Sequence, residues 1–408
     1  MVKIKGMIFI PKSTYWIGLD DTDSLAGGCT TYTFKQLLQS LEEIATITDI
    51  RLVRLWPFAP RRTRGNAAVC ARVEVEKKAQ FIDAINTFWE QNILPLQGSI
   101  QDSHHSNRMQ HPADPGLVVF EEQPPEDLYI RGVRHEVKLD ELPIGVLSLG
   151  GQGRIGATCA VAWRAKLSTW EAIAYRRPHS NGQRQICLDT LHSISNHSGI
   201  FLTVHSKNNQ QLVAPKGQSP VLFGIRGTTQ KSVEHACVRL INAENTEEAE
   251  CHLVFETNQA TNDHIEDSKK FVIQSIHVDK GHVNILSNCH QELRIHHESG
   301  EMNRIAKQLV EGDVIVVRGL NDLSDILHVE HIKISHLVPR RSGRPKCTTC
   351  DRTMKSMGKG QGIRCPICKE KHADEYTSYT PSIPLHVWME PPDDQRRHLT
   401  RPLNLSMD

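Results

Sequence analysis

The sequence predicts a multidomain protein of the α/β and α+β classes, in which two mixed units precede a small β-barrel and a zinc-binding module. The chain has 408 residues, more than one hydrophobic core usually supports. Strand-like and helix-like apolar spacings alternate up to about residue 268, and short alternating strands follow. Of the eleven cysteines, four near the C-terminus form two closely spaced pairs.

The first unit, residues 14–128, follows an N-terminal extension at 1–13 and is expected to be an α/β domain. Its last part, 98–128, is rich in His, Pro, Asp and Gln and is expected to be a loop or a transition between domains. The expected regular elements are a strand at 14–20, a helix at 31–47, strands at 51–55 and 68–75, and a helix at 77–89.

The second unit, residues 129–268, contains an apolar strand at 144–149, a glycine loop at 150–156 and a segment at 157–174 that can be helical. Residues 269–338 then read as short alternating strands. A region of this length suits a five-stranded barrel of the OB type, which commonly binds oligonucleotides. The zinc module and the C-terminal tail occupy residues 339–408.

The strongest local signal is the cysteine pattern. Cys347 and Cys350 form one pair, and Cys365 and Cys368 form a second pair 14 residues further on. Four thiolates at this spacing predict a structural, tetrahedral zinc site, and they leave no open position for catalysis. The surrounding segment 340–371 has ten Lys or Arg residues against two acidic ones. This excess favours contact with a polyanion, and the alternative is a solvated basic face.

Three carboxylates, those of Asp20, Asp21 and Asp23, follow the first predicted strand. Adjacent carboxylates repel one another unless a cation lies between them, and Mg²⁺ binds a few carboxylates together with phosphate oxygens. The pattern therefore predicts a site for magnesium and a nucleoside triphosphate. The alternative is an exposed acidic turn that caps a helix.

The turn at 27–31 brings Thr30 to the start of the expected helix. A hydroxyl beside Mg²⁺ and a helix N-terminus is well placed to accept a phosphoryl group, and the alternative is an N-cap. Arg64, Gly65 and Asn66 lie between two predicted strands and offer a cation, a flexible backbone and an amide. They read either as an ATP-phosphate-binding loop or as a solvated loop.

The glycine loop contains Gly150, Gly151, Gly153 and Gly156. It lies between a predicted strand and a helix, but no downstream pattern supports a dinucleotide fingerprint. Close approach of its backbone to a bound substrate is one interpretation, and close approach to the first domain is the other.

The seven single cysteines read as thiols in a reducing compartment, and no apolar run approaches the roughly 18 residues of a membrane span. The protein is therefore expected to be cytoplasmic and to have no membrane partner.

Several segments together resemble the archaeal tRNA(Ile) 2-agmatinylcytidine synthetase (TiaS) family. The opening motif is Ile17–Ser24 followed by Cys29–Tyr32, and the ordered combination of segments is more specific than any one of them. The others resemble family segments in the same order: Thr63–Ala67, the glycine loop, Glu171–Arg176, Pro220–Gly227, Thr257–His264 and Arg396–Leu399.

The resemblance implies a kinase-like ATP-binding domain, a ferredoxin-like domain, an OB-fold and a zinc ribbon. It also implies a ligase that joins agmatine to the wobble cytidine of a CAU-anticodon tRNA(Ile) and splits ATP to AMP and phosphate, so that the anticodon reads AUA instead of AUG. Asp20, Asp21 and Asp23 would then hold Mg-ATP, and Thr30 would match the family's autophosphorylated threonine.

Two other functions stay open from the residues alone. The first is a metal-dependent phosphohydrolase or nuclease acting on RNA, although two metals usually need further acidic or histidine ligands. The second is a non-catalytic nucleic-acid-binding protein built on the barrel and the zinc module, which leaves the acidic and glycine loops without a role.

Overall fold

The computed structural model describes residues 12–23, 27–62, 65–98, 104–105, 108–109, 111–178, 180, 182–215, 219–373 and 377–405. The chain forms two compact units. The larger unit comprises residues up to 266 together with 320–323 and 392–408, and the smaller comprises 267–319 and 324–391. Within the described ranges, no helix has both the length and the apolar character that crossing a membrane requires.

The larger unit is built on one nine-stranded sheet in the order β7-β6-β1-β3-β2-β11-β8-β10-β9. Neighbouring strands are antiparallel except β2 and β11, which are parallel and join the two halves of the sheet. The strands are β1 (Ser13–Asp20), β2 (Ala45–Arg54), β3 (Ala67–Val75), β6 (Gly116–Phe120), β7 (Leu147–Gly150), β8 (Thr169–Arg176), β9 (Ile200–Phe201), β10 (Val221–Gly227) and β11 (Ala249–Thr257).

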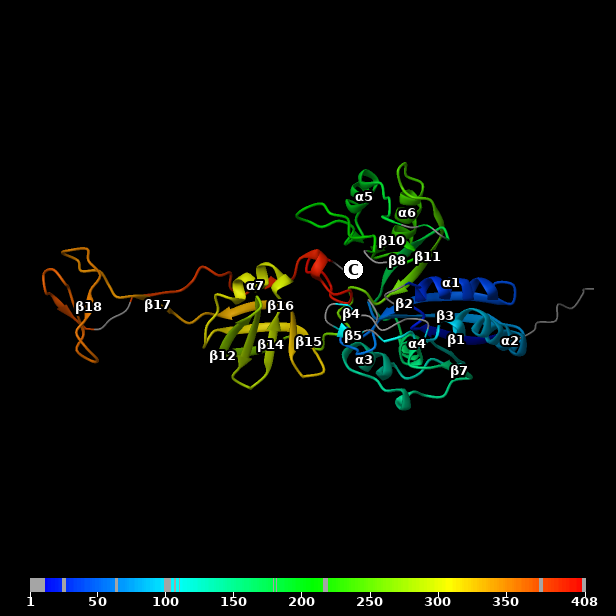
Figure 1. Ribbon diagram of the computed structural model, residues 1–408, viewed down its shortest axis with the longest axis horizontal. Coiled ribbons are helices and arrows are strands. Elements are labelled where there is room, and N and C mark those ends of the chain that lie inside the picture. The colour runs from blue at the N-terminus through cyan, green and yellow to red at the C-terminus, as the bar shows by residue number, and fades with distance from the viewer. Residues whose placement is uncertain are drawn as a thin grey trace, which may run out of the picture. The chain divides into compact units, whose positions relative to one another are not determined.

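Helices cover both faces of this sheet. Successive residues of a strand point to opposite faces, so Ile17 packs in the core under α1 and α2, whereas Trp16 packs in the core under α3 and α4. Helices α5 and α6 cover β8 and β10 (Figure 1). Their bounds are α1 (Thr30–Leu41), α2 (Lys78–Phe88), α3 (Glu126–Arg134), α4 (Gly153–Ala162), α5 (Leu188–Ser195) and α6 (Gln230–Ile241).

Short elements complete the larger unit. A π-helical turn and a 3-10 turn continue α2, another 3-10 turn precedes β7, and one more lies near the C-terminus. These turns are Trp89–Ile93, Leu94–Leu96, Leu139–Glu141 and Asp393–Gln395. Two strands of two residues each, β4 (His104–His105) and β5 (Arg108–Met109), pair with each other in an antiparallel arrangement.

Two expected helices differ from the structure. The helix expected at 31–47 ends at Leu41, because the β-branched residues from Thr46 to Thr48 belong to β2. The helix expected at 157–174 is wrong after Ala162, since β8 begins at Thr169. The segment from 129 to 162, assigned to the second unit from its sequence, packs on the first half of the sheet through α3 and α4.

The smaller unit contains the small five-stranded barrel that the alternating pattern predicts. Its strands follow the order β14-β13-β12-β15-β16, and β16 pairs back onto β14 to close the sheet. Helix α7 (Glu301–Ala306) packs against the barrel core, and β22 (Trp388–Met389) extends β16. The barrel strands are β12 (Lys269–Asp279), β13 (His282–Ser287), β14 (Glu292–Ile295), β15 (Val314–Asn321) and β16 (Leu327–His336), with a 3-10 turn at His297–Ser299.

The zinc module has a very small core, in which Met354 and Ile363 pack with the cysteines. So few apolar contacts give little stability without a metal ion. Its strands are β17 (Arg340–Gly343), paired with β21 (Thr377–Tyr379), and a three-stranded sheet of β18 (Lys355–Ser356), β19 (Ile363–Arg364) and β20 (Lys371–His372).

A buried asparagine fastens the segment after β11 to both β2 and α3. The side chain of Asn258 is fully buried and accepts the backbone N–H of Arg54 at 2.7 Å. Its amide donates to the carbonyl of Arg54 at 2.9 Å and to the hydroxyl of Tyr129 at 3.0 Å. The side chain thus replaces a strand partner for Arg54 at the end of β2.

We expect Asn258→Ala to lower the free energy of unfolding by roughly 2–4 kcal/mol, because the buried N–H and C=O of Arg54 lose their partners at about 1–3 kcal/mol each. Denaturant unfolding followed by tryptophan fluorescence measures this change. Asn196→Ala, at an exposed position after α5, is the control and should change stability little. An equal effect of both substitutions would contradict the assigned role.

Candidate active site

The three aspartates lie where β1, an inner strand of the sheet, ends between β3 and β6. The turn is tight, since Asp21 has a positive φ of 58° and its N–H donates to Asp20 Oδ1 at 2.7 Å. The N–H of Asp114, just before β6, donates to Asp21 Oδ2 at 3.1 Å. The structure therefore brings the predicted carboxylates together at one edge of the sheet.

Burial makes this cluster costly to ionise. Desolvation, followed by repulsion from Asp21, raises the pKa of Asp20 well above its usual range. The pKa of Asp21 is raised to about 7, chiefly by desolvation. The backbone hydrogen bond from Asp114 lowers this pKa, and repulsion from Asp23 raises it further. Since a cation would favour the charged forms, the electrostatics fit a metal site.

A fourth carboxylate, that of Asp114, belongs to the site although the sequence motifs do not include it. It accepts hydrogen bonds from the backbone N–H of Gln152 at 2.8 Å and from the side chain of Gln97 at 3.1 Å. Its charge adds to the forces that raise the pKa of Asp21. The only sequence signal is an aspartate within the segment 98–128, whose composition is typical of a loop.

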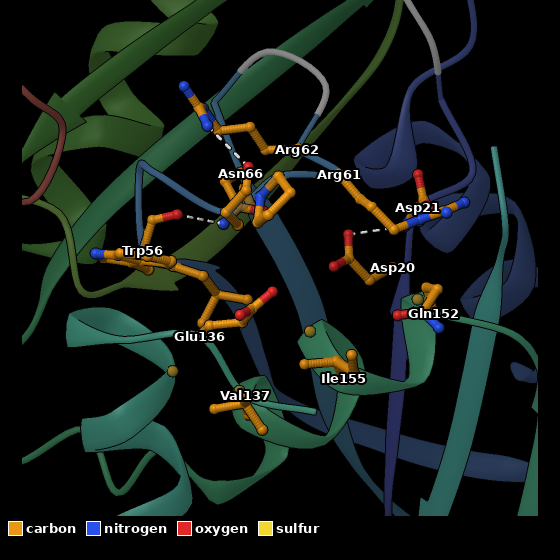
Figure 2. Close-up of a pocket in the computed structure, with 18 of the residues that line it drawn as sticks. Asp20, Asp21, Trp56, Arg61, Arg62, Asn66, Glu136, Val137, Gln152 and Ile155 are labelled. Carbon is orange, nitrogen blue, oxygen red and sulfur yellow. Dashed lines mark hydrogen bonds between the residues drawn. The ribbon is translucent and has the colours of Figure 1, made fainter. Parts of the chain in front are cut away.

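The aspartates open into a pocket with apolar walls. Trp56, Val137 and Ile155 provide apolar surface, and Arg61 contributes a positive charge that acts on Asp21 (Figure 2). The described lining is Asp20, Asp21, Asp23, Leu55, Trp56, Ala59, Pro60, Arg61, Arg62, Asn66, Ala67, Gly132, His135, Glu136, Val137, Gln152, Gly153, Ile155, Gly156 and Cys159. We call this the acidic pocket.

The glycine loop packs directly on the aspartates. A Cβ at Gly156 would lie 1.8 Å from Asp20 Oδ2, and one at Gly151 would lie 2.0 Å from Asp114 Oδ1. Gly153 and Gly156 line the acidic pocket, whereas Gly150 and Gly151 are not among the described residues of its wall. These contacts account for Gly151 and Gly156 by close approach to acidic side chains of the first domain.

Asn66 shapes the loop opposite the aspartates. It has a φ of 41°, its side chain donates to the carbonyl of Trp56 at 2.7 Å, and its own carbonyl accepts the N–H of Leu55. Gly65 leaves room for the side chain of Arg54, because a Cβ there would lie 2.4 Å from Nη1. Arg64 lies outside the described residues.

Thr30 faces a second pocket, next to the first. It is the first residue of α1, whose N-cap is Cys29, so the alternative N-cap role for Thr30 is wrong. Its hydroxyl lies 3.3 Å from that of Thr22 and 3.4 Å from the Thr22 backbone nitrogen. Asp23 and Asn66 line both pockets. We call the second one the arginine pocket.

Two partly buried arginines and one buried glutamate line the arginine pocket. Glu171 lies 3.7 Å from Arg54 Nη2 and 3.3 Å from Arg226 Nε, and it accepts a hydrogen bond from Gln259 at 2.5 Å. The two guanidinium groups, with burial, hold the pKa of His398 well below its usual value. Two arginines against one glutamate leave this lining with an excess positive charge that suits an anion.

The cysteines gather as predicted. The sulfurs of Cys347, Cys350, Cys365 and Cys368 lie within 4.8 Å of one another, which fits four-thiolate zinc binding.

In metal-free protein we expect Asp21→Asn to be stabilising. A folded pKa of about 7, against about 3.9 in an unfolded chain, means that stability is lost as pH rises between these values. Since asparagine stays neutral, the melting-temperature advantage of the variant should grow up to about pH 7 and then level off. Asp83→Asn, at an exposed position on α2, serves as the control. An advantage that shrinks with rising pH would contradict the assignment.

Three family models match the chain: the TiaS TCKD domain at residues 16–146, the TiaS FLD domain at 151–264 and the TiaS C-terminal zinc ribbon domain at 344–381. The first two models meet between residues 146 and 151, whereas the sequence pattern suggests a boundary at 128.

Full-length relatives agree with the family models. The chain is 29% identical to the tRNA(Ile) 2-agmatinylcytidine synthetase TiaS of Archaeoglobus fulgidus, over 95% of this chain and 96% of the relative. It is 30% identical to the synthetase of Cenarchaeum symbiosum, over 95% and 91% of the two chains.

Solved structures are similar over nearly the whole chain. Apo TiaS, described as a tRNA(Ile) agmatidine synthetase, matches with a TM-score of 0.74 at 27% identity, covering 96% of this chain and 97% of the other. The complex of TiaS with its tRNA(Ile) and ATP matches with a TM-score of 0.79 at 26% identity, covering 97% and 98%. The chain belongs to the family of tRNA(Ile) 2-agmatinylcytidine synthetases, TiaS, which confirms the resemblance found in its motifs.

Proposed function

We propose that this protein joins agmatine to the wobble cytidine of a CAU-anticodon tRNA(Ile) at the expense of ATP, in the cytoplasm, where tRNA and ATP are found. The observation that carries the proposal is that two unlike pockets lie next to each other and share part of their walls. The acidic pocket ends in carboxylates, the arginine pocket carries positive charge, and both share Asp23 and Asn66.

ATP is assigned to the acidic pocket. Its apolar wall, with Trp56, Val137 and Ile155, suits a purine base, and the aspartates lie where a triphosphate would extend. Asp20, Asp21 and Asp23 would hold magnesium, which neutralises phosphate charge when bound. Arg61 supports this assignment because it adds a cation beside Asp21.

The wobble nucleotide is assigned to the arginine pocket. Arg54 and Arg226 would attract its phosphate, and Thr30 lies on the same wall as Asp23. A cytosine carbonyl oxygen is a poor leaving group, but a phosphorylated oxygen can be displaced by an amine. We assign Thr30, which lines the arginine pocket, as a phosphoryl acceptor, and Gly65 as the residue that leaves room for Arg54.

The domains are assigned to match this reaction. The first half of the sheet is proposed to be the kinase-like domain and the second half the ferredoxin-like domain. The barrel is proposed to be an OB-fold, and with the basic zinc ribbon it would bind the tRNA backbone at a distance from the anticodon. Such contacts would offset the cost of unstacking the target base.

The test is nucleoside mass analysis of the CAU-anticodon tRNA after incubation with ATP, agmatine and Mg²⁺. We expect a mass gain of the wobble cytidine with the unaltered protein, and its loss in Asp21→Ala, because the triphosphate loses its metal. Asp83→Ala, on the exposed side of α2, is the matched control.

Other outcomes separate the alternatives. Shortened RNA without a mass gain would support a phosphohydrolase or nuclease. Retention of tRNA without any turnover would support a binding protein. Full activity of Asp21→Ala would refute the metal assignment.

The role of Thr30 has its own test. We expect intact-protein mass spectrometry to find one added phosphoryl group after incubation with ATP, and to find none in Thr30→Val. Thr30→Ser should restore it, because serine keeps the hydroxyl. Thr87→Val on α2 is the control. Phosphorylation of Thr30→Val to the full extent would place the acceptor elsewhere.

A further inference from the structure

A second group of metal-binding side chains lies on the barrel, outside every motif used above. His282 begins β13, His296 follows the end of β14, and Glu298 lies in the 3-10 turn after it. One potential ligand atom from each of the three side chains lies within 4.8 Å of the others. We propose that His282, His296 and Glu298 bind a divalent transition-metal ion, with zinc as the preferred occupant.

The choice of ion follows from the ligand types. Imidazole nitrogen suits zinc, cobalt, nickel and copper, whereas magnesium and calcium prefer oxygen ligands throughout. Two histidines and one carboxylate supply three of the four positions around a tetrahedral zinc ion. The fourth position is left to solvent, since the side chains of His282 and Glu298 are 32% and 55% exposed.

The two histidines are held in place by a buried residue. Asn303, which is 3% exposed, donates its side-chain amide to the carbonyls of Gly281 at 3.0 Å and Ile295 at 3.3 Å. These are the residues immediately before His282 and His296. One side chain therefore fixes the start of β13 against the end of β14, so the site needs little ordering when an ion binds.

His328 on β16 supports the second ligand. Its Nδ1 lies 2.7 Å from Nε2 of His296, and the two rings stack with centroids 5.0 Å apart. A metal-bound imidazole commonly forms a hydrogen bond through its other nitrogen, which fixes its tautomer and ring orientation. With Nε2 of His296 engaged in this way, Nδ1 is the nitrogen that can bind the ion.

His282 must exchange one contact to bind the ion. Its Nδ1 accepts the backbone N–H of His297 at 3.0 Å and lies 4.0 Å from Glu298 Oε2. Because the lone pair of this nitrogen accepts the N–H of His297, an ion bound between Nδ1 and the carboxylate replaces that N–H. The cost is that one hydrogen bond, on a side chain open to water.

Cobalt titration of the full-length protein, loaded with one equivalent of zinc so that the four-thiolate site is filled and the barrel site is left empty, tests the proposal. Zinc already fills the cysteine site, and any exchange there would be visible as thiolate-to-cobalt charge transfer. The Asp21→Asn background weakens the other candidate metal site by removing one of its carboxylates. We expect one equivalent of Co²⁺ to bind with visible d–d absorption and without charge-transfer bands.

Substitutions then identify the ligands. His296→Ala and Glu298→Ala should weaken Co²⁺ binding by more than about a hundredfold, because loss of a partner behind a ligand already costs about 10- to 100-fold. His328→Ala should weaken Co²⁺ binding by about 10- to 100-fold, because it removes only the partner behind a ligand. His277→Ala, at an exposed position on β12, is the matched control and should bind like the parent.

Circular dichroism confirms that each variant is folded before its binding is compared. Failure of the parent to bind Co²⁺ would overturn the proposal, and so would binding that His296→Ala and Glu298→Ala leave unchanged. Neither result bears on the ligase assay, because that assay is run on protein in which the barrel residues are unaltered.

Discussion

The structure depends first on the repulsion among the aspartates that follow β1. A strand end that half-buries Asp20 and Asp21 next to each other is unfavourable, as their raised pKa values indicate. The surrounding chain offsets this with backbone donors and close packing, including a glycine at 156 that has no side chain to collide with Asp20. The arrangement lowers stability at the proposed cation site, and such a loss is a common property of functional sites.

The second constraint is the parallel pairing of β2 with β11, which turns two domains into one sheet. Only two residue pairs join these strands in the described chain, Glu256 with Arg51 and Thr257 with Leu52. Side-chain hydrogen bonds therefore add to the contact between the two halves of the sheet. Asn258 fills the hydrogen-bonding positions of Arg54 just beyond the last pair. The seam between the two halves is consequently rigid where the two pockets meet, and rigid support is what a reaction between two bound substrates requires.

The sequence predicted best the features whose residues are neighbours in the chain. The cysteine pairs and the acidic turn are local patterns. In the structure the four cysteines gather at one site, and the aspartates gather at another. The arginine pocket was not predictable in the same way, since Arg54, Glu171 and Arg226 come from three strands whose order in the sheet is not written in any local spacing. The helix expected at 157–174 failed for a similar reason, because apolar residues in a buried strand and in a buried helix look alike over short windows.

The arginine pocket is also incomplete without the end of the chain. Residues 392–405 return to the larger unit, where the backbone of His398 accepts the N–H of Ala260 and that of Leu399 accepts the N–H of Asn262. This pairing places the His398 ring beside the two arginines, and Leu399 is buried in the core under α3 and α4. Since the barrel and the zinc module intervene in the chain, the pocket can be finished only after both have been synthesised. The segment 392–405 therefore links synthesis of the barrel and the zinc module to formation of the proposed nucleotide site.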